Sequence, residues 1–121
     1  MSRKPATSLA DPWPAPTIIP KHTLHEDCAD YESELAIVIG KTCKNVSEAD
    51  ALNYVLGYTA ANDVSSRKAQ LAQSQASYSK GFDGSCPIGP VLVSAAQVPD
   101  PSKFTIKGLK NGEVMQSSSL E

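Results

Sequence analysis

The clearest hydrophobic pattern in the chain is an apolar run at residues 35–39 that ends at Gly40. The run is rich in β-branched residues and is bounded by a glycine, which predicts a strand. Side chains alternate along a strand, so Ile37 and Ile39 share one face while Ala36 and Val38 lie on the other. Because both faces are apolar, we expect a central strand that is covered on both sides.

A short helix and a second strand are predicted after this run. Ser47 is typical of a helix N-cap, and Glu48 and Asp50 place acids in the first turn, where the helix dipole favours them. Gly57 is expected to end the helix. The aromatic and β-branched residues within 58–62 then predict a strand. A short connection of this kind commonly brings its two strands into one sheet.

The second half of the chain is expected to alternate loops with short strands. Residues 66–75 are rich in Ala, Gln and Lys, which predicts a weak, exposed helix or a loop, and the glycines and prolines of 78–90 predict a loop. Residues 91–93 are expected to form a short buried strand. Asn-Gly at 111–112, between two strand-like segments, is a strong signal for a β-hairpin.

Proline dominates the first 20 residues, which predicts an extended arm without a helix or a central strand. We expect Trp13, the single tryptophan, to anchor this arm. The polar residues that follow include both histidines of the chain, His22 and His25. A solvated loop is the favoured interpretation, and a ligand or base is the alternative for a histidine with acids beside it, as His25 has in Glu26. The organisation we expect is therefore an arm at 1–20 and a domain at 21–121.

Composition narrows the function classes. A chain of 121 residues with 40% apolar content supports one domain with a core. The net charge of −2 and the lack of a basic patch argue against nucleic acid. No apolar run reaches the length of a membrane span, and none follows the basic N-terminus as in a secretory signal. Three cysteines without a Cys-x-x-Cys pair favour reduced thiols in the cytoplasm, with mitochondria as the alternative.

Candidate chemistry lies in three carboxylates. Glu32 and Glu34 share one face of the first strand, where two like charges about 4 Å apart repel by roughly 4 kcal/mol at an effective dielectric near 20. They must share a proton, pair with cations or hold a metal, unless they are simply the solvated end of the strand. Asp63 follows the second predicted strand, either as a helix N-cap or as a third converging carboxylate. Three oxygen donors suit a hard cation such as Mg²⁺ or Ca²⁺.

Five sequence blocks, taken together and in order, resemble the fumarylacetoacetate hydrolase family. The resemblance runs from about Trp13 to the end of the chain. The first block is the acidic strand itself. The blocks are 30–41 (DYESELAIVIGK), 57–59 (GYT), 62–67 (NDVSSR), 80–83 (KGFD) and 87–90 (PIGP).

The resemblance implies an α+β fold, mostly β, in the form of a mixed β-roll. It implies a metal-dependent hydrolase or lyase acting on carbon–carbon bonds of small 2-oxo or diketo acids such as fumarylacetoacetate, acylpyruvates or oxaloacetate. An oxaloacetate tautomerase or dienoate isomerase is the alternative within the family. By the same resemblance Glu32, Glu34 and Asp63 bind Mg²⁺ (or Mn²⁺ or Ca²⁺), Lys80 is catalytic and contacts substrate, and Gln70 contacts substrate.

Three departures from the family pattern qualify this expectation. Lys68 stands where most relatives carry an aspartate, and neither the family's catalytic His-Glu pair nor its Gly-Thr-Pro block is present; His25-Glu26 lies too close to the metal block to be that pair. We therefore expect an incomplete β-roll in residues 21–121. A homodimer is the expected assembly. The alternative functions are a non-catalytic module that binds a divalent ion and an oxo-acid, and a structural fragment that is stable only in a dimer.

Overall fold

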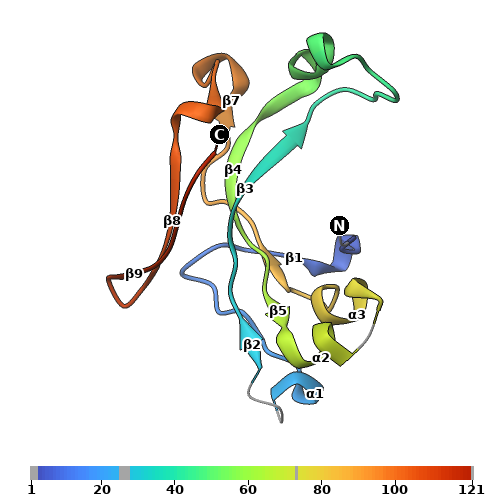
Figure 1. Ribbon diagram of the computed structural model, residues 1–121, viewed down its shortest axis with the longest axis vertical. Helices are drawn as coiled ribbons and strands as arrows, with labels where there is room; N and C mark the ends of the chain where they lie inside the picture. Colours follow the sequence, from blue (N-terminus) through green and yellow to red (C-terminus); the bar gives the residue numbers. More distant parts are fainter. Residues whose placement is uncertain (1–2, 25–27, 73, 121) are drawn as a thin grey trace.

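The computed structural model describes residues 3–24, 28–72 and 74–120. The architecture is α+β and mostly β, as predicted, with short helices packed beside small sheets (Figure 1). The strands are β1 (Leu9–Ala10), β2 (Ala29–Asp30), β3 (Ser33–Ile39), β4 (Val55–Asn62), β5 (Ser65–Ser66), β6 (Cys86–Pro87), β7 (Val93–Ser94), β8 (Thr105–Lys110) and β9 (Glu113–Ser119). The α-helices are α1 (Lys21–Leu24), α2 (Arg67–Ala72) and α3 (Ala76–Lys80), and 3-10 turns cover Ala6–Ser8, Glu48–Tyr54, Ala95–Gln97 and Pro101–Lys103.

The longest paired strands are β3 and β4, which run antiparallel through the middle of the molecule (Figure 1). The 3-10 helix Glu48–Tyr54 joins them, and Ser47 caps it as predicted: the Ser47 hydroxyl accepts from the Asp50 amide at 3.3 Å. The same hydroxyl donates to the Asp50 carboxylate at 2.6 Å. The prediction that a short connection pairs these two strands is therefore confirmed.

Two predictions about this sheet are wrong. The strand order is β3-β4-β7, so β4 is the central strand and β3 is an edge strand of this sheet. Ile37 and Ile39 are both 56% exposed and add little to a core. Gly57 does not end a helix but lies inside β4, opposite Ser94 of β7. A side chain there would collide with the backbone carbonyl of Val93, so the close approach of β7 requires glycine.

The N-terminal arm is more ordered than its prolines predicted. It contains a 3-10 turn at Ala6–Ser8, and β1 pairs in parallel with β6. Ser8 is fully buried and donates to the carbonyl of Pro5 at 2.6 Å. Trp13 does not anchor the arm, because it is 87% exposed. Buried polar contacts fix this segment instead of a large apolar side chain.

Two short helices lie in the part of the chain that was expected to be a weak helix followed by a loop. The helix α2 lies within the predicted segment 66–75. The helix α3 was not predicted, and it carries Lys80 in its last turn rather than in a glycine-rich loop. The segment 21–24 is also helical, and His22 on it is exposed. The pair His25-Glu26 lies outside the described residues.

The hairpin of β8 and β9 forms at the predicted Asn-Gly turn. Asn111 and Gly112 have φ values of 52° and 85°, which are the left-handed conformations of a tight hairpin turn. The short strand predicted at 91–93 is confined to β7 (Val93–Ser94), which is not buried, and Val91 and Leu92 before it are 63% and 49% exposed. Among the described residues, no helix is both long and apolar enough to cross a membrane.

The described part of the chain leaves many large apolar side chains in water. Its buried apolar residues are Tyr58, Val64 and Ala69, whereas Leu92 and Phe104 are about half exposed, at 49% and 51%. Exposed apolar surface, where it is contiguous, marks an interaction surface or an aggregation liability. The fold therefore predicts a chain that associates in solution.

We expect the purified chain to scatter light as a dimer or larger species rather than as a 12.8 kDa monomer. Replacing Leu92 and Phe104 together by serine should reduce this association, because it removes apolar surface. The matched control is Lys107→Ser, since Lys107 on β8 is exposed and charged and its loss removes little apolar surface. A monomeric wild type with a sharp thermal transition at high temperature would show that this expectation is wrong.

Candidate functional site

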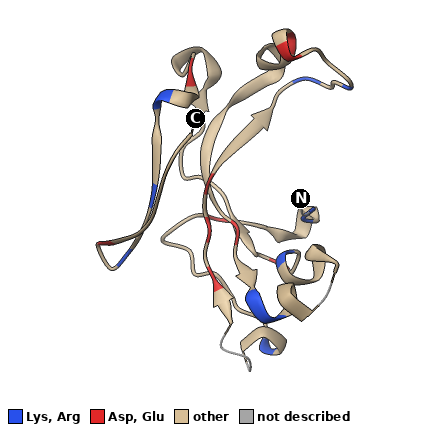
Figure 2. Ribbon diagram, viewed as in Figure 1, with Lys and Arg blue, Asp and Glu red and all other residues tan. Residues whose placement is uncertain are grey.

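The pairing register of β3 and β4 brings the predicted carboxylates together. Ser33 lies opposite Asn62, so Glu32 lies beside Asp63, and the Asp63 amide donates to the Glu32 carbonyl at 2.9 Å. One oxygen each from Glu32, Glu34 and Asp63 lies within 4.8 Å of the others. The red segments of β3 and of the chain after β4 accordingly meet at the centre of Figure 2. Asp63 is not a helix N-cap, because α2 begins only at Arg67.

Lys80 projects from the end of α3 into the gap between two of these carboxylates. Its ammonium donates to Glu32 Oε2 at 2.7 Å, to Asp63 Oδ2 at 2.8 Å and to Ser65 Oγ at 2.8 Å. The side chain of Lys80 is only 7% exposed. An ammonium has three N–H donors, so these three contacts use its full capacity.

A second lysine, Lys4, reaches the same group from the N-terminal arm. Its ammonium contacts Asp63 Oδ1 at 2.8 Å and Ser85 Oγ at 2.9 Å, and it also donates to the carbonyl of Lys80. The Ser85 hydroxyl in turn donates to the Lys80 carbonyl at 2.7 Å. Sequence reasoning missed Lys4 because the arm was interpreted only as an extended segment. The sequence did offer one indication: three close carboxylates need several cations, and Lys4 is one of the lysines of the chain.

Arg67, at the start of α2, completes the positive side of the site. Its guanidinium contacts Glu32 Oε1 at 2.6 Å and Asp30 Oδ2 at 2.7 Å. It also donates to the amide oxygen of Gln70 at 2.9 Å. Gln70 is thereby oriented with its oxygen toward Arg67, and its amide nitrogen is the group that it can offer to a ligand.

The charges fix the protonation states of the two most buried groups. Burial would raise the pKa of Asp63, but the hydrogen bonds and charges of Lys4 and Lys80 outweigh it and hold that pKa below its usual range. Burial would lower the pKa of Lys80, but Asp63 and Glu32 outweigh it and raise that pKa. Both groups therefore remain ionised at neutral pH.

Glu34 differs from the other two carboxylates. Within the described parts of the chain, no lysine or arginine forms an ion pair with it. Burial, followed by the charges of Asp63 and Glu32, raises the pKa of Glu34. It lines a cavity of about 580 Å³ that also exposes Glu32, Asp63, Lys80, Lys4 and Gln70. A carboxylate that faces two others without a cation of its own is a group that a bound cation would stabilise.

The donor set fits a hard divalent cation. All three side chains offer carboxylate oxygens, which Mg²⁺, Mn²⁺ and Ca²⁺ prefer, and no cysteine or histidine belongs to the cluster found among the described residues. The three oxygens already lie within a span that one ion can bridge after small side-chain movements. Lys80 and Lys4 supply the positive charge that keeps the cluster together in the absence of an ion.

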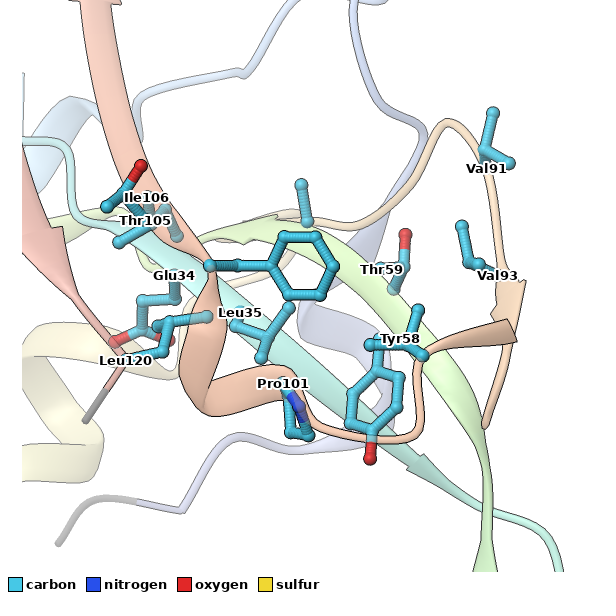
Figure 3. A pocket seen from close by; sticks show the side chains of 13 residues that line it. Glu34, Leu35, Tyr58, Thr59, Val91, Val93, Pro101, Thr105, Ile106 and Leu120 are labelled. Atoms are coloured by element: carbon cyan, nitrogen blue, oxygen red, sulfur yellow. The ribbon is translucent and has the colours of Figure 1, made fainter. Parts of the chain in front are cut away.

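A second cavity, of about 300 Å³, lies against the same strand and is mostly apolar. In Figure 3 Glu34 lies at one end of it and Val91 and Val93 at the other, with Leu35 and Pro101 between them. Glu34 therefore borders both the charged cavity and the apolar cavity.

The sequence model of the family described as Fumarylacetoacetate (FAA) hydrolase C-terminal matches residues 3–121. The chain belongs to the fumarylacetoacetate hydrolase family. The predicted resemblance is thus confirmed, and it extends further into the N-terminal arm than the sequence blocks indicated.

Relatives of known sequence or structure agree with this assignment. An uncharacterized protein of Staphylococcus saprophyticus is 44% identical over 101 residues, which are 84% of this chain and 34% of that protein. The chain therefore spans about a third of this relative. The structure of 2-hydroxyhepta-2,4-diene-1,7-dioate isomerase from Mycobacterium marinum matches with TM-score 0.85 and 39% identity over 96% of this chain and 43% of that one. Fumarylacetoacetate hydrolase from Exiguobacterium antarcticum matches with TM-score 0.79 and 37% identity over 96% and 40%.

These comparisons confirm the α+β fold of the family type and place the chain in a family that contains hydrolases and isomerases. The structure brings Glu32, Glu34, Asp63, Lys80 and Gln70 to one cavity. Their roles as ligands, catalytic group and substrate contact remain predictions.

We expect Lys4→Met to lower the free energy of unfolding by about 1–3 kcal/mol, because it leaves Asp63 Oδ1 and the Ser85 hydroxyl without their charged donor. Urea unfolding at neutral pH measures this change. Arg3→Met is the matched control, since Arg3 is an exposed cation on the same arm. Equal stabilities of the two variants would contradict a role for Lys4 in the site.

Proposed function

We propose that this chain is the metal-binding part of an enzyme that acts on small 2-oxo or diketo acids with a divalent cation. The observation that carries the proposal is the meeting of Glu32, Glu34 and Asp63 with Lys80 in one cavity, where Glu34 forms no ion pair with any described lysine or arginine. A cation site beside a positioned ammonium suits chemistry in which negative charge develops on a substrate oxygen. Two solved relatives, a 2-hydroxyhepta-2,4-diene-1,7-dioate isomerase and a fumarylacetoacetate hydrolase, support the same substrate class.

Glu32, Glu34 and Asp63 are the proposed ligands of Mg²⁺, with Mn²⁺ or Ca²⁺ as alternatives. When bound, such an ion acts as a Lewis acid that polarises the carbonyl of an oxo-acid. The protein holds these ligands through the β3–β4 register and through the buried position of Asp63, which is 7% exposed. Protonation of Glu34 opposes cation binding, so affinity should fall as the pH drops below the raised pKa of this group.

Lys80 is the proposed electrostatic catalyst. A compact ammonium near the reacting carbonyl stabilises an enolate as its charge develops. In the present structure all three Lys80 donors are engaged by Glu32, Asp63 and Ser65. Lys80 can therefore donate to a substrate only after at least one of these acceptors turns to another partner.

Gln70 is the proposed substrate contact. It lines the charged cavity, and Arg67 holds its amide oxygen, which leaves the amide N–H groups to donate to a substrate oxygen. The cavity is thus lined by a donor from α2 and, once Lys80 releases one of its acceptors, by a donor from α3. This arrangement suits a small acid with several oxygens better than an apolar ligand.

Two narrower readings of the same site differ in what happens after the enolate forms. Carbon–carbon cleavage by hydrolysis or decarboxylation is the first, and tautomerisation or isomerisation without cleavage is the second. A module that binds ion and oxo-acid without turnover is the third candidate, because the family's catalytic His-Glu pair is not found in this sequence. Turnover of oxaloacetate or an acylpyruvate with Mg²⁺ separates the catalytic readings from the binding module.

Mg²⁺ or Mn²⁺ should raise the melting temperature of the chain, because an ion that binds only the folded state stabilises it by about 2.7 kcal/mol at 100 times its Kd. The shift should disappear in Glu32→Gln combined with Asp63→Asn, each compared with its own metal-free melting temperature. Asp11→Asn combined with Glu113→Gln is the control, since both of these carboxylates are exposed and neither lines the charged cavity. An unchanged shift in the first double variant would refute the proposed ligands.

Lys80→Met should lower kcat on an oxo-acid roughly 100-fold, because the ammonium acts mainly when the enolate charge develops. The dissociation constant for Mn²⁺ should change less, and the exposed Lys107→Met should match the wild type. Steady-state kinetics with oxaloacetate and Mg²⁺ measures kcat. A full kcat in Lys80→Met would exclude the catalytic role, and a wild type without turnover would favour the binding module.

A further inference from the structure

The side chain of Gln116, on β9, hydrogen-bonds to the backbone on both sides of Glu32. Its amide oxygen accepts from the Ser33 amide at 2.8 Å, and its amide nitrogen donates to the Tyr31 carbonyl at 2.9 Å. These two backbone groups flank the proposed metal ligand directly. Gln116 is thus linked to the charged site although it does not line the charged cavity.

The backbone around Glu32 needs such a partner because it lies just outside the sheet. The strand β3 begins at Ser33, so the β3–β4 ladder does not include Tyr31 or Glu32. The Glu32 amide donates to the side chain of Asn62 at 3.2 Å, and its carbonyl accepts from Asp63 at 2.9 Å. A primary amide carries a donor nitrogen and an acceptor oxygen, as a peptide group does, so Gln116 imitates a neighbouring strand residue on the other side.

The hairpin is shaped to allow this contact. Gly108 on β8 lies opposite Gln116 in the ladder and is buried. A Cβ at Gly108 would collide with the Ser33 hydroxyl and would lie 3.2 Å from the amide oxygen of Gln116. The β8–β9 hairpin can therefore approach Ser33 only because position 108 has no side chain.

We infer that Gln116 is a positioning residue for Glu32. Through Gln116, the β8–β9 hairpin becomes part of the metal site. The inference rests on the proposed function. At present Arg67 and Lys80 also hold the Glu32 carboxylate, at 2.6 and 2.7 Å. When a cation takes this carboxylate, its backbone anchor determines where the oxygen lies. Loss of groups that orient a metal ligand typically lowers metal affinity 10–100-fold.

The test compares three single variants of the chain. Gln116→Leu removes both hydrogen bonds at similar size. Gln116→Glu keeps the acceptor for Ser33 but replaces the donor to Tyr31 by a carboxylate oxygen. Gly112→Ala is the matched control, because it strains the φ = 85° turn of the same hairpin with nothing within 4 Å of the new methyl group. Mn²⁺ affinity comes from electron paramagnetic resonance titration, and hydrogen exchange of the Ser33 amide reports on the backbone without metal.

The expected result is a 10–100-fold weaker Mn²⁺ affinity in Gln116→Leu and Gln116→Glu, with faster exchange of the Ser33 amide in Gln116→Leu. Gly112→Ala should bind Mn²⁺ within about twofold of the wild type. Wild-type affinity in a folded Gln116→Leu or Gln116→Glu variant would overturn the inference. An equal loss in Gly112→Ala would also overturn it, since general loosening of the hairpin would then suffice. A wild type that binds no Mn²⁺ would instead contradict the proposed function, and the inference with it.

Discussion

The constraint on which this structure depends is the repulsion among three carboxylates that share one small volume. Glu32, Glu34 and Asp63 bring oxygens within 4.8 Å of one another, and Asp63 is almost fully buried. Such a group is stable in a folded chain only where cations, a shared proton or a metal offset the repulsion. The chain supplies positive charge from Lys4 in the arm and from Arg67 and Lys80 on α2 and α3.

Polar contacts join several segments of the chain at this site. The three cations come from segments that are far apart in the sequence, so ion pairs and hydrogen bonds join the arm, two helices and the central strands at one place. The fully buried side chains of the described residues are serines and a threonine. Among them, the hydroxyl of Ser65 accepts from Lys80 and that of Ser85 accepts from Lys4.

Local patterns in the sequence were enough to predict β3, β4, the Ser47 cap and the hairpin turn, because each follows from periodicity or from one special residue. The meeting of Asp63 with the glutamates followed from pairing the two strands. The contribution of Lys4 could not be predicted in this way, since it depends on contacts with residues 59 to 81 positions later in the chain. The exposure of Trp13 and of Ile37 likewise depends on what packs against them rather than on their own hydrophobicity.

All three N–H donors of Lys80 are already engaged, and this bears on whether folding must wait for a bound ion. Many small metalloproteins stay unfolded until their ion arrives, because nothing else can satisfy the ligands. Here a lysine built into the chain acts as a resident counterion for Glu32 and Asp63. If these carboxylates bind a cation as proposed, folding does not depend on that cation, because Lys80 already pairs with Glu32 and Asp63.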